Sequence, residues 1–415
     1  MKTMKHLLLI LPFVWAVSCQ PKVEMNFEDG ELIHGAMQKL TDIIVYDIFS
    51  PPVASRIYAY ASIAGYEAML PANPEYQTLA GQIEGLEPTP QPEPGKAYNH
   101  AVAGVHAFLT VGRALIFSED KMEAYQQQLY GQFEQALDDD VYENSMAYGK
   151  QVADHIMAWA DKDMYKQTRT FPKFTVKNEP GRWQPTPPDY MDGIEPHWRE
   201  IRPLVIDSAG QFPPAPPTPF SIDEDSQFYQ EMMEVYETGN NLTDEQEEIA
   251  KFWDCNPYVS HHQGHVMFAT KKITPGGHWI GITAIASRQS GADLMQATEA
   301  YAFTSVALMD AFISCWDEKY RSNLIRPETV INQHLDPDWT PLLQTPPFPE
   351  YTSGHSVISS SAAVALTHIF GDNFAFLDTT EVMYGLPPRE FNSFIEASEE
   401  AAISRLYGGI HYMPA

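Results

Sequence analysis

Apolar residues recur every three or four positions through most of this 415-residue chain, and few stretches alternate as β-strands do. The clearest early stripes cover residues 33–44, 102–109, 122–137 and 152–159. Helices of about 15 to 20 residues with one apolar face must bury that face against neighbouring helices. We therefore expect an all-α protein made of helical bundles, with four to six helices over residues 30–162.

Start and stop signals place further helices in the second half of the chain. Thr243 followed by Gln246 is a capping box, and Thr274 before Pro275 is typical of a helix start. Three more helices are expected, over residues 294–316, 353–370 and 391–408.

The N-terminus has the pattern of an export signal. In "MKTMKHLLLILPFVWAVSC", Lys2 and Lys5 precede an apolar run and a small residue before Cys19. The run is shorter than the roughly 20 apolar residues that span a bilayer. "AVSC" resembles the lipobox of bacterial lipoproteins, in which the cysteine is acylated. We expect residues 1–18 to be removed and the chain to be an exported lipoprotein, anchored to the outer membrane or facing the periplasm; an ordinary cleaved signal is the alternative.

Residues 166–220 differ in composition from the rest of the chain. "GRWQPTPPDY" and "QFPPAPPTPF" are rich in proline, which is excluded from helix interiors, and in aromatic residues, which are uncommon in flexible linkers. We therefore expect an ordered segment that wraps over the helices. The expected organisation is a signal over residues 1–18, an N-terminal bundle over 19–165, this segment, and a C-terminal catalytic bundle over 221–415.

The formal net charge of −29 disfavours general attraction to nucleic acid or to an anionic lipid surface. We expect no nucleic-acid partner, and contact with a membrane only through a lipid on Cys19. Any bound anion must be held by a local cluster of cations, because distant charges are screened beyond about 8 Å. Two other cysteines, Cys255 and Cys315, could pair or remain buried free thiols.

Three short stretches near the C-terminus each join a cation or a histidine to an expected helix end. They are "KYRSNLIRP", "YTSGHS" and "SRLYGGIHYMPA". The candidate functional residues in them are Lys319, Arg326, Ser353, Gly354, His355, Arg405 and His411.

Brought together, these residues would bind a tetrahedral oxyanion. Arg326 and Arg405 can each present a planar fork of donors, and Lys319 adds a point charge. Backbone N–H groups at Ser353 and Gly354 would add a helix N-terminal anion site. Each cation at about 4 Å contributes around 4 kcal/mol before desolvation, so the local cluster outweighs the screened acidic charge.

The two histidines have different candidate roles. His355 could act as a general acid or base near neutral pH, whereas His411 could attack or ligate the central atom of the anion. Each stretch also has a purely structural interpretation when taken singly: a solvated lysine at a helix end, an arginine in a surface ion pair, and a turn.

The order Lys-x6-Arg-Pro, Ser-Gly-His and Ser-Arg-x5-His resembles the signature of the vanadium haloperoxidase and type 2 phosphatidic acid phosphatase superfamily, a helical-bundle fold. The resemblance implies that His411 is the vanadium ligand of a haloperoxidase or the phosphorylated nucleophile of a phosphatase. It also implies that His355 is the acid–base residue and that Lys319 polarises the bound oxidant. The residues implied to bind vanadate or phosphate oxygens are Lys319, Arg326, Ser353, Gly354 and Arg405.

Two positions depart from that signature. Thr352 replaces the proline that commonly precedes Ser-Gly-His. Ala415 occupies the fourth position after His411, where many members have an aspartate that orients this histidine. A nucleophilic histidine needs its other ring nitrogen held by an acceptor, so the phosphatase role requires an acid from elsewhere, in this chain or in a final helix beyond Ala415.

The long N-terminal helical region and the proline-rich segment resemble the large haloperoxidases, of chloroperoxidase-like bacterial type, more than the compact phosphatases. Phe348, seven residues before His355, occupies a position that is often aromatic in chloride oxidisers. We therefore expect a vanadate-dependent haloperoxidase that oxidises halide with hydrogen peroxide to hypohalous acid. The alternatives are an acid phosphatase that hydrolyses small phosphoesters through a phosphohistidine, without a cofactor, and a non-catalytic surface lipoprotein.

Other histidines lie outside these stretches. His261 and His265 are four residues apart, a spacing that could hold zinc on a helix, but no third ligand is evident. His278 and Trp279 could line the mouth of a pocket.

Overall fold

The computed structural model describes residues 24–263, 266–269 and 271–415, so the export signal and Cys19 lie outside the described residues. The described residues form an all-α protein, which confirms the fold class predicted from the helical periodicity. Two short antiparallel hairpins are the only sheets in this part of the chain. None of its helices is long and apolar enough to cross a membrane.

The N-terminal part contains five long helices and one short turn. Pro51 and Pro52 begin the second helix, where proline at the first positions is tolerated. These elements are α1 (Glu31–Asp47), α2 (Pro51–Met69), η1 (Leu70–Ala72), α3 (His100–Leu115), α4 (Glu119–Ala136) and α5 (Asp139–Ala160).

Helix α2 is buried on every face. All of its residues are shielded from solvent, because α3 and α5 of the N-terminal part and α10 (Leu294–Ser322) of the C-terminal part surround it. It carries no single apolar stripe, since a helix without a solvent-facing side needs none.

The proline-rich segment is largely irregular and packs against the helices. It contains only α6 (Tyr165–Thr168) and η2 (Trp198–Glu200). The side chains of Trp183 and Trp198 are fully buried. The carboxylate of Asp310 on α10 accepts hydrogen bonds of 2.7 to 3.0 Å from the backbone N–H groups of residues 204–206. These contacts hold the segment to the helices.

The C-terminal part begins its helices at the signals in the sequence. Thr243 and Gln246 form the predicted capping box, Thr274 caps α9, and Ser353 caps α12. The helices, besides α10, are α7 (Gln227–Asn240), α8 (Asp244–Phe252), α9 (Pro275–Ser290), α11 (Pro327–His334), α12 (Gly354–Phe370) and α13 (Phe394–Tyr407). The hairpins are β1 (Ser260–Gln263) with β2 (Val266–Ala269), and β3 (Phe376–Asp378) with β4 (Arg389–Phe391); η3 is Val382–Tyr384.

The first hairpin changes the interpretation of two histidines. Residue 261 lies in β1, and the partner strand β2 begins at residue 266. The helical zinc pair suggested by the spacing of His261 and His265 is therefore wrong, and His265 itself lies outside the described residues.

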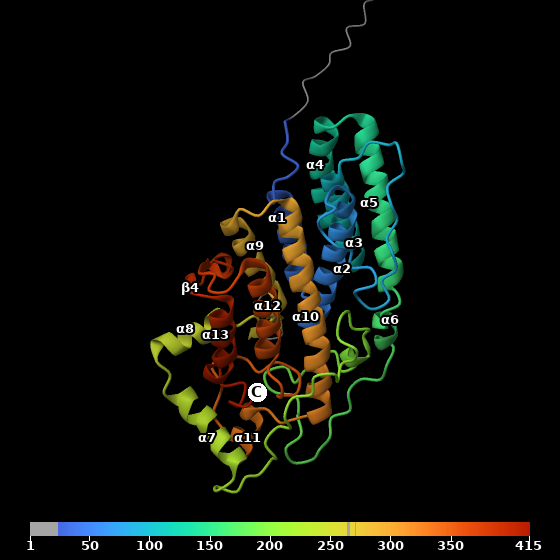
Figure 1. Cartoon of the computed structure of the whole chain (residues 1–415). Helices are drawn as coiled ribbons and strands as arrows, with labels where there is room; N and C mark the ends of the chain where they lie inside the picture. Colours follow the sequence, from blue (N-terminus) through green and yellow to red (C-terminus); the bar gives the residue numbers. More distant parts are fainter. Residues whose placement is uncertain (1–23, 264–265, 270) are drawn as a thin grey trace, which may run out of the picture.

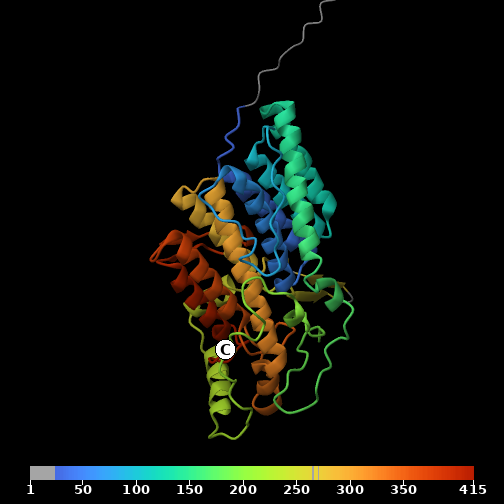
Figure 2. The ribbon, with the colours of Figure 1, turned by 45° about the vertical axis from the view of Figure 1, so that its right-hand side comes forward.

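The N-terminal and C-terminal helices share one hydrophobic core. One continuous cluster of buried residues runs from α1 to α13. In both views of the ribbon, α10 runs along the middle of an elongated molecule, with α3, α4 and α5 toward one end and α7 toward the other (Figure 1, Figure 2). The contact of α10 with both α2 and α12 joins the two groups of helices.

Candidate active site

The three C-terminal stretches meet at one end of the second group of helices. Lys319 lies in the last turn of α10, and Arg326 is the N-cap residue of α11. Ser353 is the N-cap of α12, so Gly354 and His355 open that helix. The remaining two residues are Arg405, in the last turn of α13, and His411, in the loop after it.

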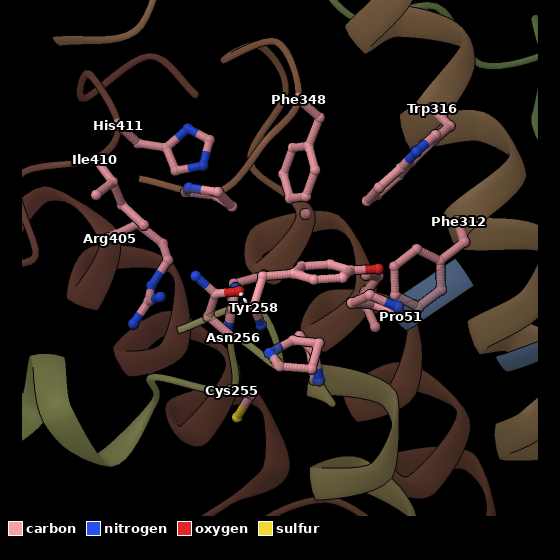
Figure 3. Close-up of a pocket in the computed structure, with 16 residues that line it drawn as sticks. Pro51, Cys255, Asn256, Tyr258, Phe312, Trp316, Phe348, Arg405, Ile410 and His411 are labelled. Carbon is pink, nitrogen blue, oxygen red and sulfur yellow. Dashed lines mark hydrogen bonds between the residues drawn. The ribbon is translucent and has the colours of Figure 1, made fainter. Parts of the chain in front are cut away.

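A small cavity lies where these segments meet. Gly354, His355, Arg405 and His411 line it directly. Arg326 and Lys319 contact residues that line it, and Ser353 directly precedes Gly354. In the close-up of Figure 3, His411 and Arg405 lie on the left. The aromatic side chains of Trp316 and Phe312 lie on the right, with Phe348 above and Tyr258 at the centre (Figure 3). The cavity therefore has a cationic side and an aromatic side.

His411 is buried and held through both ring nitrogens. Its Nδ1 lies 2.8 Å from Oε1 of Glu350, and its Nε2 lies 3.1 Å from Nη1 of Arg326. Because a carboxylate accepts and a guanidinium donates, Nδ1 carries the proton and Nε2 presents a lone pair. Burial, and then the charges of Arg326 and Lys319, hold the pKa of His411 well below its usual range. The ring is therefore neutral and Nε2 can bind an electrophilic centre.

Glu350 supplies the carboxylate that seemed to be missing after His411. It is fully buried, and its Oε1 accepts hydrogen bonds from His411 and from the backbone N–H of Tyr412, at 3.1 Å. Burial raises the pKa of Glu350 to about 7, against the opposing charges of Arg326 and Lys319. The acid comes from the segment before α12 and not from the position that Ala415 occupies.

Arg326 has one nitrogen, with its two N–H groups, left without a partner among the described residues. Its Nε donates to the Phe348 carbonyl at 2.9 Å, and Nη1 donates to the Ile410 carbonyl at 2.8 Å. Its Nη2 is buried and has no hydrogen-bond partner among the described residues. Burial lowers the pKa of Arg326 to about 10, which still leaves it charged at neutral pH. A buried, charged, unpartnered N–H group is costly, and an anion would satisfy it.

Lys319 holds the segment that carries Glu350. Its Nζ donates to the carbonyls of Pro349 and Glu350 at 3.1 and 3.0 Å, and also to the carbonyl of Thr352. Burial lowers the pKa of Lys319 to about 7. In this arrangement Lys319 fixes the position of the segment whose carboxylate orients His411.

Arg405 reaches the cavity from the end of α13. Its Nε donates to Oγ of Ser404 at 3.0 Å, and its Nη2 donates to the Ala250 carbonyl at 3.2 Å. The chain then turns at Gly409, whose φ of +76° is in the left-handed region. A Cβ at Gly409 would also approach Pro341 to 3.0 Å. This turn brings His411 back to the same cavity as Arg405.

Ser353 and His355 differ in whether their side chains have hydrogen-bond partners. The Oγ of Ser353 accepts from the backbone N–H of Ser356 at 3.3 Å, so this hydroxyl acts as a helix cap. The Nε2 of His355 is buried without a hydrogen-bond partner in the described part of the chain. Burial, and then the charge of Arg405, hold the pKa of His355 well below its usual range. His355 is therefore neutral and can accept a proton at Nε2.

The structure thus gathers all seven predicted residues around one cavity, and it adds groups that the sequence did not indicate. Glu350 is one of these groups. A glutamate inside the apolar run "PPFPEY" does indicate a buried acid, because such a side chain must have a partner when it is buried. Residues 255–258 form another part of the wall and have no motif. Cys255 and Cys315 are both free and buried.

Comparisons with known proteins agree with this arrangement. Residues 299–415 match the family model of the VCPO second helical-bundle domain. Among curated proteins, none matches the chain significantly. A bacterial vanadium-dependent iodoperoxidase is similar in structure, with a TM-score of 0.90 and 55% sequence identity over 94% of this chain and 93% of that chain.

Two further solved structures share the fold at low sequence identity. The holo form of a bacterial vanadium-dependent chloroperoxidase gives a TM-score of 0.69 at 16% identity, over 94% of each chain. The apo form gives 0.68 at 17% identity, over 93% of each chain. At these identities the likeness concerns the fold alone.

Proposed function

The chain belongs to the vanadium-dependent haloperoxidases, and from this premise we propose that it oxidises iodide with hydrogen peroxide. The observation that carries the choice of halide is the 55% identity to an iodoperoxidase along almost the whole chain. The aromatic side of the cavity supports it, because iodide is large, polarisable and weakly hydrated and therefore loses little on leaving water.

The residues around the cavity fit vanadate. Nη2 of Arg326 and Nε2 of His355 are buried without partners among the described residues, and Nε2 of His411 presents a lone pair. His411 would hold the metal, and the cations with the N-terminus of α12 would hold its oxygens. When bound, vanadate supplies Lewis-acid activation of hydrogen peroxide without a change of oxidation state.

The chain's own groups prepare the reaction. Glu350 keeps the proton of His411 on Nδ1, so the lone pair lies on Nε2; in the structure it accepts from Nη1 of Arg326, and it is the lone pair that would bind the metal. His355 can accept a proton from hydrogen peroxide at Nε2, because it is neutral and unpartnered there. Arg405 and Arg326 stabilise the negative charge that remains. Phe348 and Trp316, whose ring centroids lie 5.0 Å apart, limit the access of water.

Purified chain loaded with vanadate should form triiodide from iodide and hydrogen peroxide, and bromide should react at least about tenfold more slowly. The same protein without vanadate should hydrolyse an aryl phosphate only weakly. Equal or faster bromide oxidation would reject the choice of iodide but keep the family activity. Phosphatase activity that vanadate only inhibits, with no halide oxidation, would reject haloperoxidase activity altogether.

We also propose that Cys19 carries a lipid and places the enzyme on the outer membrane or facing the periplasm. The support is the "AVSC" stretch after the apolar run; these residues lie outside the described part of the structure. In a bacterial host, the wild-type chain should incorporate labelled fatty acid and sediment with membranes. Cys19→Ser should lose both properties, and a wild-type chain that is cleaved but unacylated would contradict the proposal.

A further inference from the structure

A second polar cluster includes one residue of the cavity wall, Cys255. It consists of Cys255, His278 and Glu381, and each of these side chains is buried. The three come from separate places in the chain: the loop after α8, the first turn of α9, and the position before η3. Among the residues that the structure describes, these three are the group of histidine, cysteine and acidic side chains whose spacing could hold a metal ion.

The distances within this cluster match those between the ligands of a zinc ion. Nδ1 of His278 lies 3.4 Å from Sγ of Cys255 and 3.2 Å from Oε1 of Glu381. With bonds of about 2.3 Å to sulfur and 2.0 to 2.2 Å to nitrogen and oxygen, tetrahedral ligand atoms lie roughly 3.3 to 3.7 Å apart. The third edge, from Sγ to Oε1, is 3.9 Å, which a wider sulfur–metal–oxygen angle accommodates.

The other nitrogen of His278 is fixed as it is in metal sites. Its Nε2 lies 2.8 Å from Oδ2 of Asp378 and 2.8 Å from Oγ1 of Thr380. The hydroxyl of Thr380 in turn donates to Oδ1 of Asp378 at 2.7 Å. A carboxylate behind a histidine places the proton on the far nitrogen and leaves the near one free to bind metal. Trp253 stacks on the imidazole with ring centroids 4.5 Å apart and covers it from solvent.

We propose that Cys255, His278 and Glu381 bind one zinc ion, with a water molecule in the fourth position. The thiolate and the carboxylate neutralise the two positive charges, as a buried site requires. A ligand set of one sulfur, one nitrogen and one carboxylate oxygen suits zinc among the common divalent ions, whereas calcium and magnesium take oxygen ligands.

The zinc ion would have a structural role next to the catalytic cavity. Cys255 begins the stretch that ends at Tyr258 and lines the cavity. Bound to zinc, Cys255 would be tied to α9 through His278 and to the loop after β3 through Glu381. The ion would thus hold one wall of the cavity in place.

Elemental analysis of the whole, untagged chain tests this proposal. Purified wild-type protein, equilibrated with zinc and then dialysed, should contain about one zinc per chain, whether or not vanadium is bound. Cys255→Ala should retain less than a tenth of that zinc. Cys315→Ala removes the other buried free cysteine, whose sulfur hydrogen-bonds to Thr352, and should retain the zinc.

A second measurement covers the case in which Cys255→Ala does not fold. Wild-type protein loaded with cobalt(II) in place of zinc should show a thiolate-to-cobalt charge-transfer band in the near ultraviolet. Folded wild-type protein without zinc and without this band would overturn the proposal, and so would a folded Cys255→Ala that keeps its zinc. Vanadium measured in the same samples separates this result from any failure of the haloperoxidase assignment.

Discussion

Replacing His411 by alanine should lower the rate of iodide oxidation by at least about three orders of magnitude. The substitution removes the neutral nitrogen that can bind the metal, whereas Arg326 and Arg405 remain to attract the anion. We therefore expect vanadate to bind weakly and to exchange freely with phosphate. Steady-state kinetics with iodide and equilibrium dialysis of vanadate measure the two effects separately.

His368→Ala is a matched control, because His368 is an exposed histidine in the last turn of α12. This variant should keep the wild-type rate and affinity for vanadate. A folded His411→Ala that retains more than about a tenth of the activity would show that His411 does not bind the metal.

Substitutions at Glu350 should have the second largest effect, of about 10- to 100-fold on activity or vanadate affinity. Glu350→Gln keeps an oxygen that can accept from Nδ1 of His411, but it removes the charge. Its loss of activity or vanadate affinity should therefore be about 10-fold. Glu350→Ala removes both the accepting oxygen and the charge, and it leaves Nδ1 of His411 buried without an acceptor. Its loss should therefore be about 100-fold. The kinetics and vanadate binding of both variants test this order.

Glu67→Gln controls for the cost of placing an amide where a buried glutamate stood. Glu67 is buried on α2 and accepts hydrogen bonds from Thr78 and from the backbone of Leu79. Its substitution should lower the melting temperature without changing the affinity for vanadate. If both Glu350 variants bound vanadate as tightly as the wild type, Glu350 would have only a structural role.

The residues around the cavity were predictable where the sequence carries a local pattern. Ser353 caps the helix that it was expected to cap, and Arg405 lies in the last turn of the helix expected over residues 391–408. The helix expected over residues 294–316 instead extends to Ser322, past Lys319, and the helix that follows Arg326 was not predicted. The order of the three stretches then indicated that they meet. Such short-range signals depend on backbone chemistry close to the residue itself.

Local sequence patterns could not predict the partner of Glu350. It contacts His411 across 61 residues of sequence, and the contact depends on how the loop after α13 returns toward α12. The residues that follow His411 in the sequence include no acid, since Ala415 occupies the expected position. Long-range pairs of this kind depend on tertiary packing, which helical periodicity does not encode.

Helix α2 was absent from the predicted stripes for a related reason. Periodicity reveals a helix through the contrast between a buried face and a solvated face. The burial of every residue from Pro51 to Met69 removes that contrast. The central helix of the fold is therefore the one that the pattern describes least well.

The catalytic cavity takes parts of its wall from both groups of helices, which are joined through the buried helix α2. Pro51, the first residue of α2, lines the catalytic cavity together with Pro275 at the start of α9 and Tyr258 from the loop between them. All seven candidate functional residues lie within residues 299–415, the part that matches the family model. That part alone lacks Pro51, Tyr258 and Pro275 of the wall. The C-terminal helices alone therefore do not complete the catalytic cavity.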